Sequence, residues 1–238
     1  MEPPVNALTM QARILRIRQE TPTVKSFLLD IGTDEFDFYP GQWIDFYIDE
    51  KSNPPVIGGF TMVSSPTEKG RIQLCIKRDG WAAQWLHDHV KEGDVYKIRG
   101  PGGQFLFKEG MADSLVMIAG GIGINPLMCI VRYVDAKKLN IPMFLFYSVK
   151  TPEEFLFWDD LHAIEKHNPL LKVWYTATQP QGYWAGRKGR ITPELIREAR
   201  PTGNPLYYLC GPKGMPTAMD QMLKGMGIDA GTIQMEEW

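Results

Sequence analysis

The chain of 238 residues is poor in the residues that cross-link proteins or bind metals. It has three cysteines, at positions 75, 129 and 210, and four histidines. Three scattered cysteines provide neither a disulfide framework nor the four thiolates of an iron–sulfur cluster, so any such cluster belongs to a partner. His87 and His89 flank Asp88, but no pair of histidines follows an H-x-x-x-H spacing. The sequence therefore predicts no metal site.

Long apolar runs and a marked excess of charge are also absent. No apolar run approaches the roughly 20 residues that span a bilayer, and the formal net charge is -2. A nearly neutral chain favours neither nucleic acid nor an anionic membrane as a partner. The first residues, MEPPVNALTMQ, show no leader pattern. We expect an intracellular, cytoplasmic protein, or a mitochondrial one if a leader has been removed.

The pattern of the sequence changes near residue 108. Before it, short alternating or β-branched segments are separated by turn residues and interrupted by one helical stretch that Gly93 closes. This pattern predicts a six-stranded antiparallel barrel with a short helix at one end, residues 1–108. After it, apolar strands alternate with helices, which predicts an α/β domain with a parallel sheet, residues 109–238. The expected strands are 12–20, 25–31, 43–49, 60–65, 71–78, 94–100, 114–119, 143–149, 172–177, 205–210 and 233–238, and the expected helices are 80–93, 125–139, 153–167, 191–199 and 214–226.

A glycine-rich turn, AGGIGINP, follows the first strand of the second domain. Glycines let the chain turn tightly and bring its backbone close to a ligand, and the N–H groups that start a helix favour a phosphate. Asn125 is expected to cap the helix and Pro126 to lie in its first turn. A glycine-rich turn without a ligand is the alternative. The candidate phosphate contacts are Gly120, Gly121, Gly123, Ile124, Asn125 and Pro126.

Two later strand ends carry further candidates. One strand ends in YSVK, without the acidic residue of the usual dinucleotide fingerprint, and its Ser148 and Lys150 suit a ribose or its phosphate. Another strand delivers Cys210, Gly211 and Pro212 to the carboxyl edge of the sheet, where open α/β sheets bind ligands. Cys210 is either part of that pocket or an inert small hydrophobe.

These motifs, taken in order, resemble the ferredoxin–NADP reductase superfamily. YPGQW and FTMVSSP precede AGGIGINP, FYSVKTPEEFLF, GRKGRI and CGPKGM, so the resemblance covers nearly the whole chain. GGF before the serines, WLH in the first helix and a C-terminal Trp resemble one subgroup of it. The resemblance implies an FAD-binding barrel, with FMN the less favoured flavin, and an NAD(P)H-binding domain. Hydride would pass from nicotinamide to flavin, and electrons on to a separate protein or small-molecule acceptor.

The resemblance also implies roles for single residues. Phe60 corresponds to the tyrosine that stacks on the flavin, and Thr61 to the hydroxyl that reaches flavin N5. Cys210 would lie beside nicotinamide C4, in a pocket that the next two residues shape. Trp238 corresponds to a C-terminal aromatic residue that covers the flavin until nicotinamide displaces it. Thr61, Cys210 and Trp238 are therefore the expected catalytic residues.

Two phosphate contacts of that superfamily are missing. Its R-x-Y-[ST] motif reads GGFT here, so Gly58 replaces the arginine that pairs with the flavin phosphate. Its G-x-x-S motif reads GWAA, so Ala83 replaces a serine. We expect the backbone N–H groups of Gly58 and Gly59 to replace part of what is lost.

Positive charge for that phosphate has candidate sources nearby. Lys77 and Arg78, which follow Ile76 at a strand end, are either cofactor contacts or a solvated strand end. His87 either contacts the cofactor or is a structural residue of its helix. The sequence thus leaves open whether these residues replace the missing arginine.

The hydride donor is open between NADH and NADPH. Lys150, Arg187, Lys188 and Arg190 are candidates for binding a 2′-phosphate, although Arg187 and Arg190 alternatively brace a loop. Gln179 stands where related reductases often have an arginine, which favours NADH.

Two functions remain open as well. The hydride-transfer residues favour a flavin-dependent NAD(P)H oxidoreductase. The lost phosphate contacts favour a non-catalytic nucleotide-binding or assembly protein with weakened flavin binding.

Overall fold

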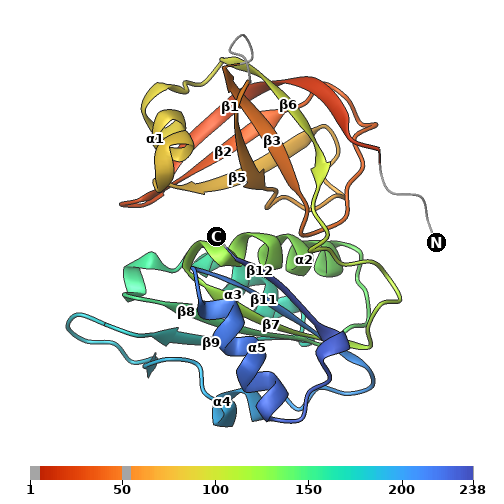
Figure 1. The fold of residues 1–238 in the computed structure, drawn as a ribbon, viewed down its shortest axis with the longest axis vertical. Coiled ribbons are helices and arrows are strands. Elements are labelled where there is room, and N and C mark those ends of the chain that lie inside the picture. Colours follow the sequence, from red (N-terminus) through yellow and green to blue (C-terminus); the bar gives the residue numbers. More distant parts are fainter. Residues whose placement is uncertain (1–5, 50–54, 238) are drawn as a thin grey trace. The chain divides into compact units, whose positions relative to one another are not determined.

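The computed structural model describes residues 6–49 and 55–237. The chain divides into two compact units, residues 1–107 and 108–238. The first unit is built from strands and one helix, and the second alternates strands with helices (Figure 1). Each contains a six-stranded sheet, antiparallel in the first and parallel in the second, so the predicted fold class is confirmed.

The first unit is a barrel. Its elements are β1 (Leu8–Thr21), β2 (Val24–Asp30), β3 (Trp43–Asp49), β4 (Val56–Thr61), β5 (Arg71–Lys77), α1 (Gly80–His89) and β6 (Val95–Gly102). The strands lie in the order β4-β3-β6-β1-β2-β5, and a bridge between Met62 and Leu74 joins the two outer strands. Alternate side chains point inward and form a core that includes Ile14, Phe27 and Phe46.

Three elements of this unit have boundaries that differ clearly from the prediction, and the first is β1, which begins at Leu8 and not at residue 12. The strand expected at 60–65 is β4, which runs from Val56 to Thr61. It begins before residue 60 because Gly58 and Gly59 pair in register with β3 despite their poor strand propensity. Helix α1 ends at His89 and not at Gly93. Val90 is already extended, and Gly93 forms a later turn with a φ of 91° in which its N–H donates to the carbonyl of Ile14.

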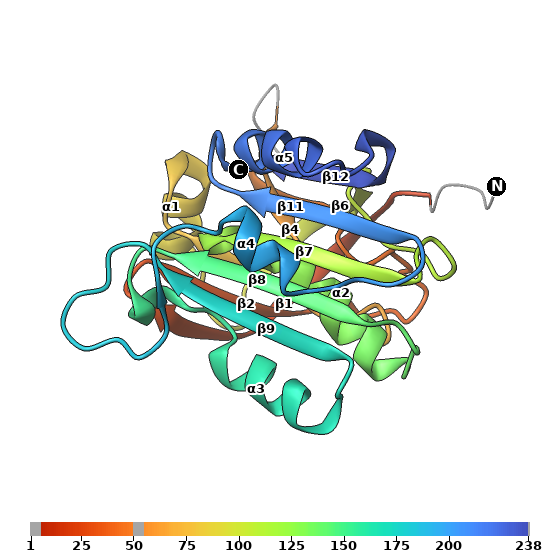
Figure 2. The ribbon, with the colours of Figure 1, turned by 90° about the horizontal axis from the view of Figure 1, so that it is seen from below.

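The second unit is a parallel sheet between two layers of helices (Figure 2). Its elements are β7 (Ser114–Gly120), η1 (Gly121–Gly123), α2 (Ile124–Ala136), β8 (Met143–Val149), η2 (Pro152–Glu154), α3 (Trp158–His167), β9 (Leu171–Ala177), β10 (Arg187–Lys188), α4 (Pro193–Arg197), β11 (Pro205–Gly211), α5 (Met215–Gly225), η3 (Ala230–Thr232) and β12 (Ile233–Glu237). The strand order is β10-β9-β8-β7-β11-β12.

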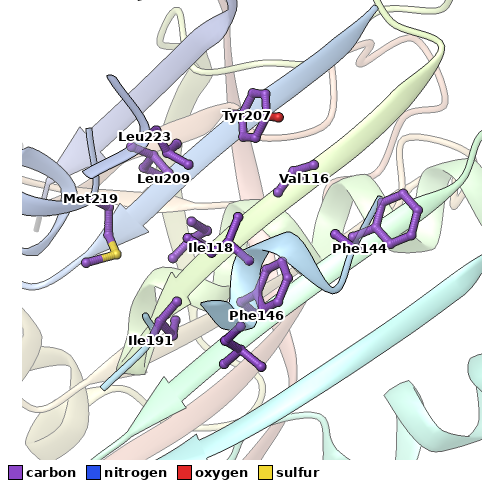
Figure 3. Packing of buried hydrophobic residues seen from close by; sticks show 12 residues of the cluster. Val116, Ile118, Phe144, Phe146, Ile191, Tyr207, Leu209, Met219 and Leu223 are labelled. Atoms are coloured by element: carbon purple, nitrogen blue, oxygen red, sulfur yellow. The ribbon is translucent and has the colours of Figure 1, made fainter. Parts of the chain in front are cut away.

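Each face of this sheet has its own helices. Val116, Ile118 and Phe146 lie on one face and pack against Leu195 of α4 and Leu223 of α5 (Figure 3). Helix α2 packs on β7 and β11. The strands are therefore apolar on both faces, as the sequence predicts for a covered parallel sheet.

The helix predicted at 153–167 is wrong in its first turn. Residues 152–154 form a 3-10 turn, and α3 begins only at Trp158. Phe157 adopts a φ of 57°, which interrupts a regular helix at that point. The two-residue strand β10 was not predicted, because two residues are too short for a strand pattern.

Candidate functional site

The glycine-rich turn lies at the carboxyl end of β7. Gly121 has a φ of 51°, and nothing lies within 4 Å of the position that a Cβ would take, so its backbone borders open space. Gly120 and Gly123 face the chain itself. A Cβ on Gly120 would overlap Met215 Sδ, and one on Gly123 would overlap the backbone of Cys210. Packing therefore explains two of the glycines, and the open approach of a ligand fits the third.

The start of α2 differs from the prediction. Gly123 is the N-cap and Ile124 the first helical residue, so Asn125 is not the cap. The 3-10 turn at 121–123 leads directly into the helix, which leaves no extended residue to act as a side-chain cap. Pro126 does lie in the first turn, as predicted. Asn125 is buried within that turn.

A row of small residues crosses the carboxyl edge of the sheet beside this turn. Gly120 pairs with Ser148, and Ser148 with Thr176, so their side-chain positions share one face. Thr176 is 1% exposed, and its Oγ1 has no hydrogen-bond partner in the described part of the chain. Lys150 is exposed just beyond β8. A buried hydroxyl without a partner is costly, so this row suits a ligand that supplies a hydrogen bond.

The CGP sequence meets the glycine-rich turn. Cys210 is a buried thiol at the end of β11 and pairs with Ala119 of β7. A Cβ on Gly120 would stand 2.8 Å from Pro212 Cδ, and one on Gly211 would stand 3.3 Å from Gly120 Cα. The structure thus joins two motifs that lie about 90 residues apart, because parallel strands end at the same edge.

Glu236 is the residue at this edge that the sequence analysis missed. It lies opposite Cys210 on β12, and its Oε2 is buried without a hydrogen-bond partner among the described residues. Burial raises the pKa of Glu236 to about 7. Gln234, two residues earlier and on the same face, likewise buries Oε1 without a described partner. Polar residues at alternate positions of IQMEEW were the available signal, because a covered parallel strand should be apolar on both faces.

Arg187 is tied to the neighbouring helix. Its Nη2 donates to Glu198 Oε2 at 2.8 Å, and Trp174 Nε1 donates to the same oxygen at 3.0 Å. This arrangement favours the loop-bracing alternative for Arg187. Arg190 is exposed, and the N–H of Gln179 donates to the carbonyl of Lys150 at 2.8 Å, next to the end of β8.

In the first unit, the ring of Phe60 folds back over Gly58. A Cβ on Gly58 would stand 2.7 Å from Phe60 Cε2 and 3.3 Å from the Cβ of Ala82 in α1. Phe60 also contacts Phe46 edge-on, with ring centroids 6.5 Å apart. A side chain at position 58 would therefore have to displace the end of the Phe60 ring.

Gly59 and Thr61 lie on the other face of β4. The nearest atom to a Cβ on Gly59 would be Trp43 Cε3 at 3.8 Å, an ordinary contact. Thr61 pairs with Trp43 and is 5% exposed. Phe60 and Thr61 thus point in opposite directions from the strand.

The charged residues near α1 bind one another. Arg78 forms a two-pronged ion pair with Asp88, at 2.7 and 2.9 Å. His87 is buried, and its Nε2 lies 2.8 Å from the carbonyl of Ile76. Burial, the largest cause, lowers the pKa of His87, so its ring is neutral at pH 7. Lys25 Nζ donates to the carbonyl of His87 at 2.8 Å. This geometry favours the structural alternatives for Arg78 and His87.

The remaining candidates at α1 are an exposed lysine and a buried methyl group. Lys77 is exposed at the end of β5, and Ala83 is buried in the first turn of α1. Asp79 is the N-cap of α1, and its side chain makes no capping hydrogen bond.

One expected catalytic residue, Trp238, lies outside the described residues. Within 6–49 and 55–237, no helix is long and apolar enough to cross a membrane. The same residues contain no cluster of three or more His, Cys, Asp or Glu side chains that could hold a metal ion.

Models of two known domain families match the chain. The oxidoreductase FAD-binding domain matches residues 12–107, and the oxidoreductase NAD-binding domain matches residues 117–221. Each match lies within one of the two compact units.

Known proteins are similar over nearly the whole chain. Oxidoreductase NAD-binding domain-containing protein 1 from Homo sapiens is 33% identical over 95% of this chain and 79% of its own length. A glycine betaine monooxygenase reductase subunit from Chromohalobacter salexigens is 27% identical over 91% of this chain and 61% of its own length. The solved FAD/NAD-binding domain of a nitric oxide dioxygenase from Vibrio cholerae has the same fold, with a TM-score of 0.84 and 22% identity over 96% of this chain and 98% of that domain.

Proposed function

We propose that the chain is a flavin-dependent NAD(P)H oxidoreductase, because it belongs to the family of oxidoreductase NAD-binding domain-containing protein 1. This family lies within the ferredoxin–NADP reductase superfamily. The chain takes hydride from a nicotinamide nucleotide onto a flavin, and electrons pass on to a separate acceptor. A reductase subunit among the relatives supports the second half of this proposal.

The carboxyl edge of the second unit carries the proposal. The open backbone of Gly121 follows Gly120 along the chain, and the buried hydroxyl of Thr176 lies two strands from Gly120, beyond Ser148. Backbone N–H groups at the start of α2 favour the nucleotide's diphosphate. Ser148, Thr176 and the nearby Lys150 are placed to bind the adenosine half, since all three lie at the ends of β8 and β9.

The nicotinamide end of this edge is formed by Cys210 and Glu236. We assign Cys210, with Gly211 and Pro212, to orienting the nicotinamide ring, as a positioning thiol and not a nucleophile. Glu236 can hold a proton on Oε2 at neutral pH, because burial raises its pKa to about 7. A polar group of this kind beside the thiol suits a pocket where charge changes during reaction.

We propose that the first unit binds the flavin through the flavin's ring system. Phe60 provides an aromatic face on one side of β4, and a bound flavin supplies the two-electron acceptor; Thr61 is buried on the opposite side and does not share that face. Gly58 and Gly59 offer only backbone to the phosphate end. This lack of side-chain contacts for the flavin phosphates supports a second candidate function, a non-catalytic nucleotide-binding or assembly protein.

NADH is the donor that the side chains favour. Arg187 is engaged by Glu198, and Gln179 provides an amide where a cation would bind a 2′-phosphate. Arg190 and Lys188 are exposed and remain the candidates for NADPH. We also propose a reducing compartment inside the cell, since all three cysteines are buried thiols.

Anaerobic reduction of added FAD tests the proposed function. NADH is expected to bleach the flavin absorbance of a protein–FAD mixture faster than NADPH does. Cys210→Ala should slow this bleaching at saturating nucleotide, whereas Cys129→Ala, which removes another buried thiol, should not. A protein that gains no flavin band and oxidises neither nucleotide would instead support the non-catalytic function.

A further inference from the structure

We infer that the flavin is an exchangeable second substrate of this protein, recognised through its ring system and not through its phosphates. The inference rests on the proposed function, because it concerns the same flavin. It is drawn from the β4–α1 edge, by which we mean residues 56–61 and 76–89. The described side chains there do not form a site for a diphosphate.

Hydrocarbon fills the position where a cation on β4 would point. Phe60 Cε2 and Cζ stand 2.7 and 2.8 Å from the place of a Gly58 Cβ, and Ala82 Cβ stands 3.3 Å from it. Ala83 adds a buried methyl group in the first turn of α1. A phosphate placed against these groups would lose water without gaining hydrogen bonds in return.

The nearby basic side chains are already engaged. Both terminal nitrogens of Arg78 bind the carboxylate of Asp88. Lys25 donates to the carbonyl of His87, and the His87 ring bonds to the carbonyl of Ile76. A phosphate could recruit Arg78 only by breaking a charge-assisted pair of hydrogen bonds.

The remaining donors at this edge are uncharged backbone N–H groups, in Gly58, Gly59 and the start of α1, and the exposed Lys77, and each is weak. The N–H groups that start α1 favour an anion, but Asp79 places a carboxylate at the same helix end, and its charge opposes that of a phosphate. Lys77 is exposed at the end of β5. An exposed lysine attracts a phosphate only weakly, because water and salt screen the pair.

The groups that fit a flavin are those for its tricyclic ring. Phe60 offers an aromatic surface, and riboflavin, FMN and FAD share the ring that it would contact. The three flavins should therefore bind alike and exchange with solution. The balanced reaction is NAD(P)H + H⁺ + flavin → NAD(P)⁺ + dihydroflavin. The nicotinamide C4–H bond breaks and its hydride forms a flavin N5–H bond, while flavin N1 takes up the H⁺ from solution.

Titration with three flavins tests the inference. Riboflavin, FMN and FAD are added to the full chain, and binding is followed by flavin fluorescence at low and high NaCl. Dissociation constants within about tenfold of one another, and little changed by salt, are expected. One charged phosphate contact would favour FAD over riboflavin by about 10- to 150-fold. FAD binding more than about tenfold tighter than riboflavin therefore overturns the inference.

Variants of β4 test whether the missing cation at position 58 is the reason why the phosphates are not recognised. Gly58→Arg introduces a guanidinium once the Phe60 ring swings aside, and it should raise the FAD-to-riboflavin affinity ratio by about tenfold or more. Gly59→Arg, on the opposite face of the strand, is the matched control and should leave the ratio unchanged. An unchanged ratio in Gly58→Arg, with riboflavin binding retained, contradicts the inference.

An exposed residue covers the case in which Gly58→Arg does not fold. Lys77→Ala should leave the FAD-to-riboflavin ratio unchanged, and a fall of tenfold would identify a phosphate contact and overturn the inference. Tight FAD binding with NADH-driven bleaching overturns this inference alone. Binding of no flavin at all overturns the proposed function as well.

Discussion

The carboxyl edge of the parallel sheet and the β4–α1 edge of the barrel both contain glycines and polar groups, but these residues have different surroundings at the two edges. At the sheet edge, Gly123 faces the backbone of Cys210, whereas at the barrel edge Gly58 faces the end of the Phe60 ring. The first neighbour is fixed by the sheet. The second belongs to a side chain that can rotate.

The two edges also differ in whether their polar groups have hydrogen-bond partners. Thr176, Gln234 and Glu236 bury oxygens without hydrogen-bond partners in the described part of the second unit. In the first unit, buried His87 is bonded to Ile76, and Arg78 is paired with Asp88. A site built for a polar ligand retains unsatisfied groups at a cost in stability, and a satisfied edge does not. The carboxyl edge of the sheet therefore keeps more unsatisfied polar groups for a ligand than the β4–α1 edge does.

The largest expected effect is at Gly123. Gly123→Ala forces a methyl group into the Cys210 carbonyl and should destabilise the second unit by about 3 kcal/mol. Gly121→Ala has open space and bears only the strain of a positive φ, about 1–2 kcal/mol. Urea unfolding followed by far-UV circular dichroism measures both. Equal losses would show that packing does not distinguish the two glycines.

Glu236 gives the second largest effect, as a pH dependence. Its pKa is raised in the folded chain from 4.5 to about 7, so its carboxyl adds stability that is fully present below 4.5 and is lost as pH rises through about 7. Allowing for solvent screening, the loss should be about 1–2 kcal/mol. Urea unfolding between about pH 5 and 8 should show this decline in the native chain and not in Glu236→Gln.

A neighbouring carboxylate is the control for that slope. Glu237 lies on the opposite face of β12, where its Oε2 accepts the N–H of Gly214 at 2.9 Å. Glu237→Gln should preserve the decline with pH. If the fall in unfolding free energy with pH disappears in both variants, its cause is the charge at the end of β12 in general and not the buried carboxyl of Glu236.

A smaller effect is expected on nucleotide preference. Glu198→Gln weakens the hold on Arg187 and should raise kcat/KM for NADPH relative to NADH by about threefold, since an exposed ion pair is worth at most about 1 kcal/mol. Glu194→Gln, which alters the Arg197 pair on the same helix, should leave the ratio unchanged. A ratio unmoved by either variant would mean that Arg187 does not approach the 2′ position.

The smallest effect is at Gly58. Gly58→Ala displaces only the end of the Phe60 ring and should cost no more than about 1 kcal/mol, while Gly59→Ala should be neutral or slightly stabilising. Thermal unfolding followed by tryptophan fluorescence is the measurement. A loss at Gly58 as large as that at Gly123 would remove the distinction between the two edges.

Much of this arrangement could be predicted from the sequence, because it depends on periodicity. Strand–helix alternation implies parallel strands, and parallel strands bring Gly120, Ser148 and Cys210 to one edge. The site roles of these residues remain predictions. Side-chain conformation carries no such period, so the turn of Phe60 over Gly58 could not be predicted.

Local backbone choices were harder still to predict. The helix predicted from residue 153 begins at Trp158, because Phe157 takes a left-handed conformation that sequence seldom signals for an aromatic residue. Glu236 was missed although Gln234 and Glu236 stand at alternate positions, because alternation assigns residues to one face of a strand without showing whether that face is buried. Its burial follows from pairing with β11, which the sequence pattern does not show.

The Phe60 ring provides a magnetic reporter. One α-proton of Gly58 points at ring carbons where a Cβ would stand 2.7 Å away, so the ring current should displace its resonance from that of the other α-proton. Gly59, whose Cβ position is 3.8 Å from the nearest Trp43 atom, offers a comparison in the same strand. When the ring swings away, the two Gly58 resonances should move together. A nuclear magnetic resonance spectrum can therefore follow this ring before any ligand is added.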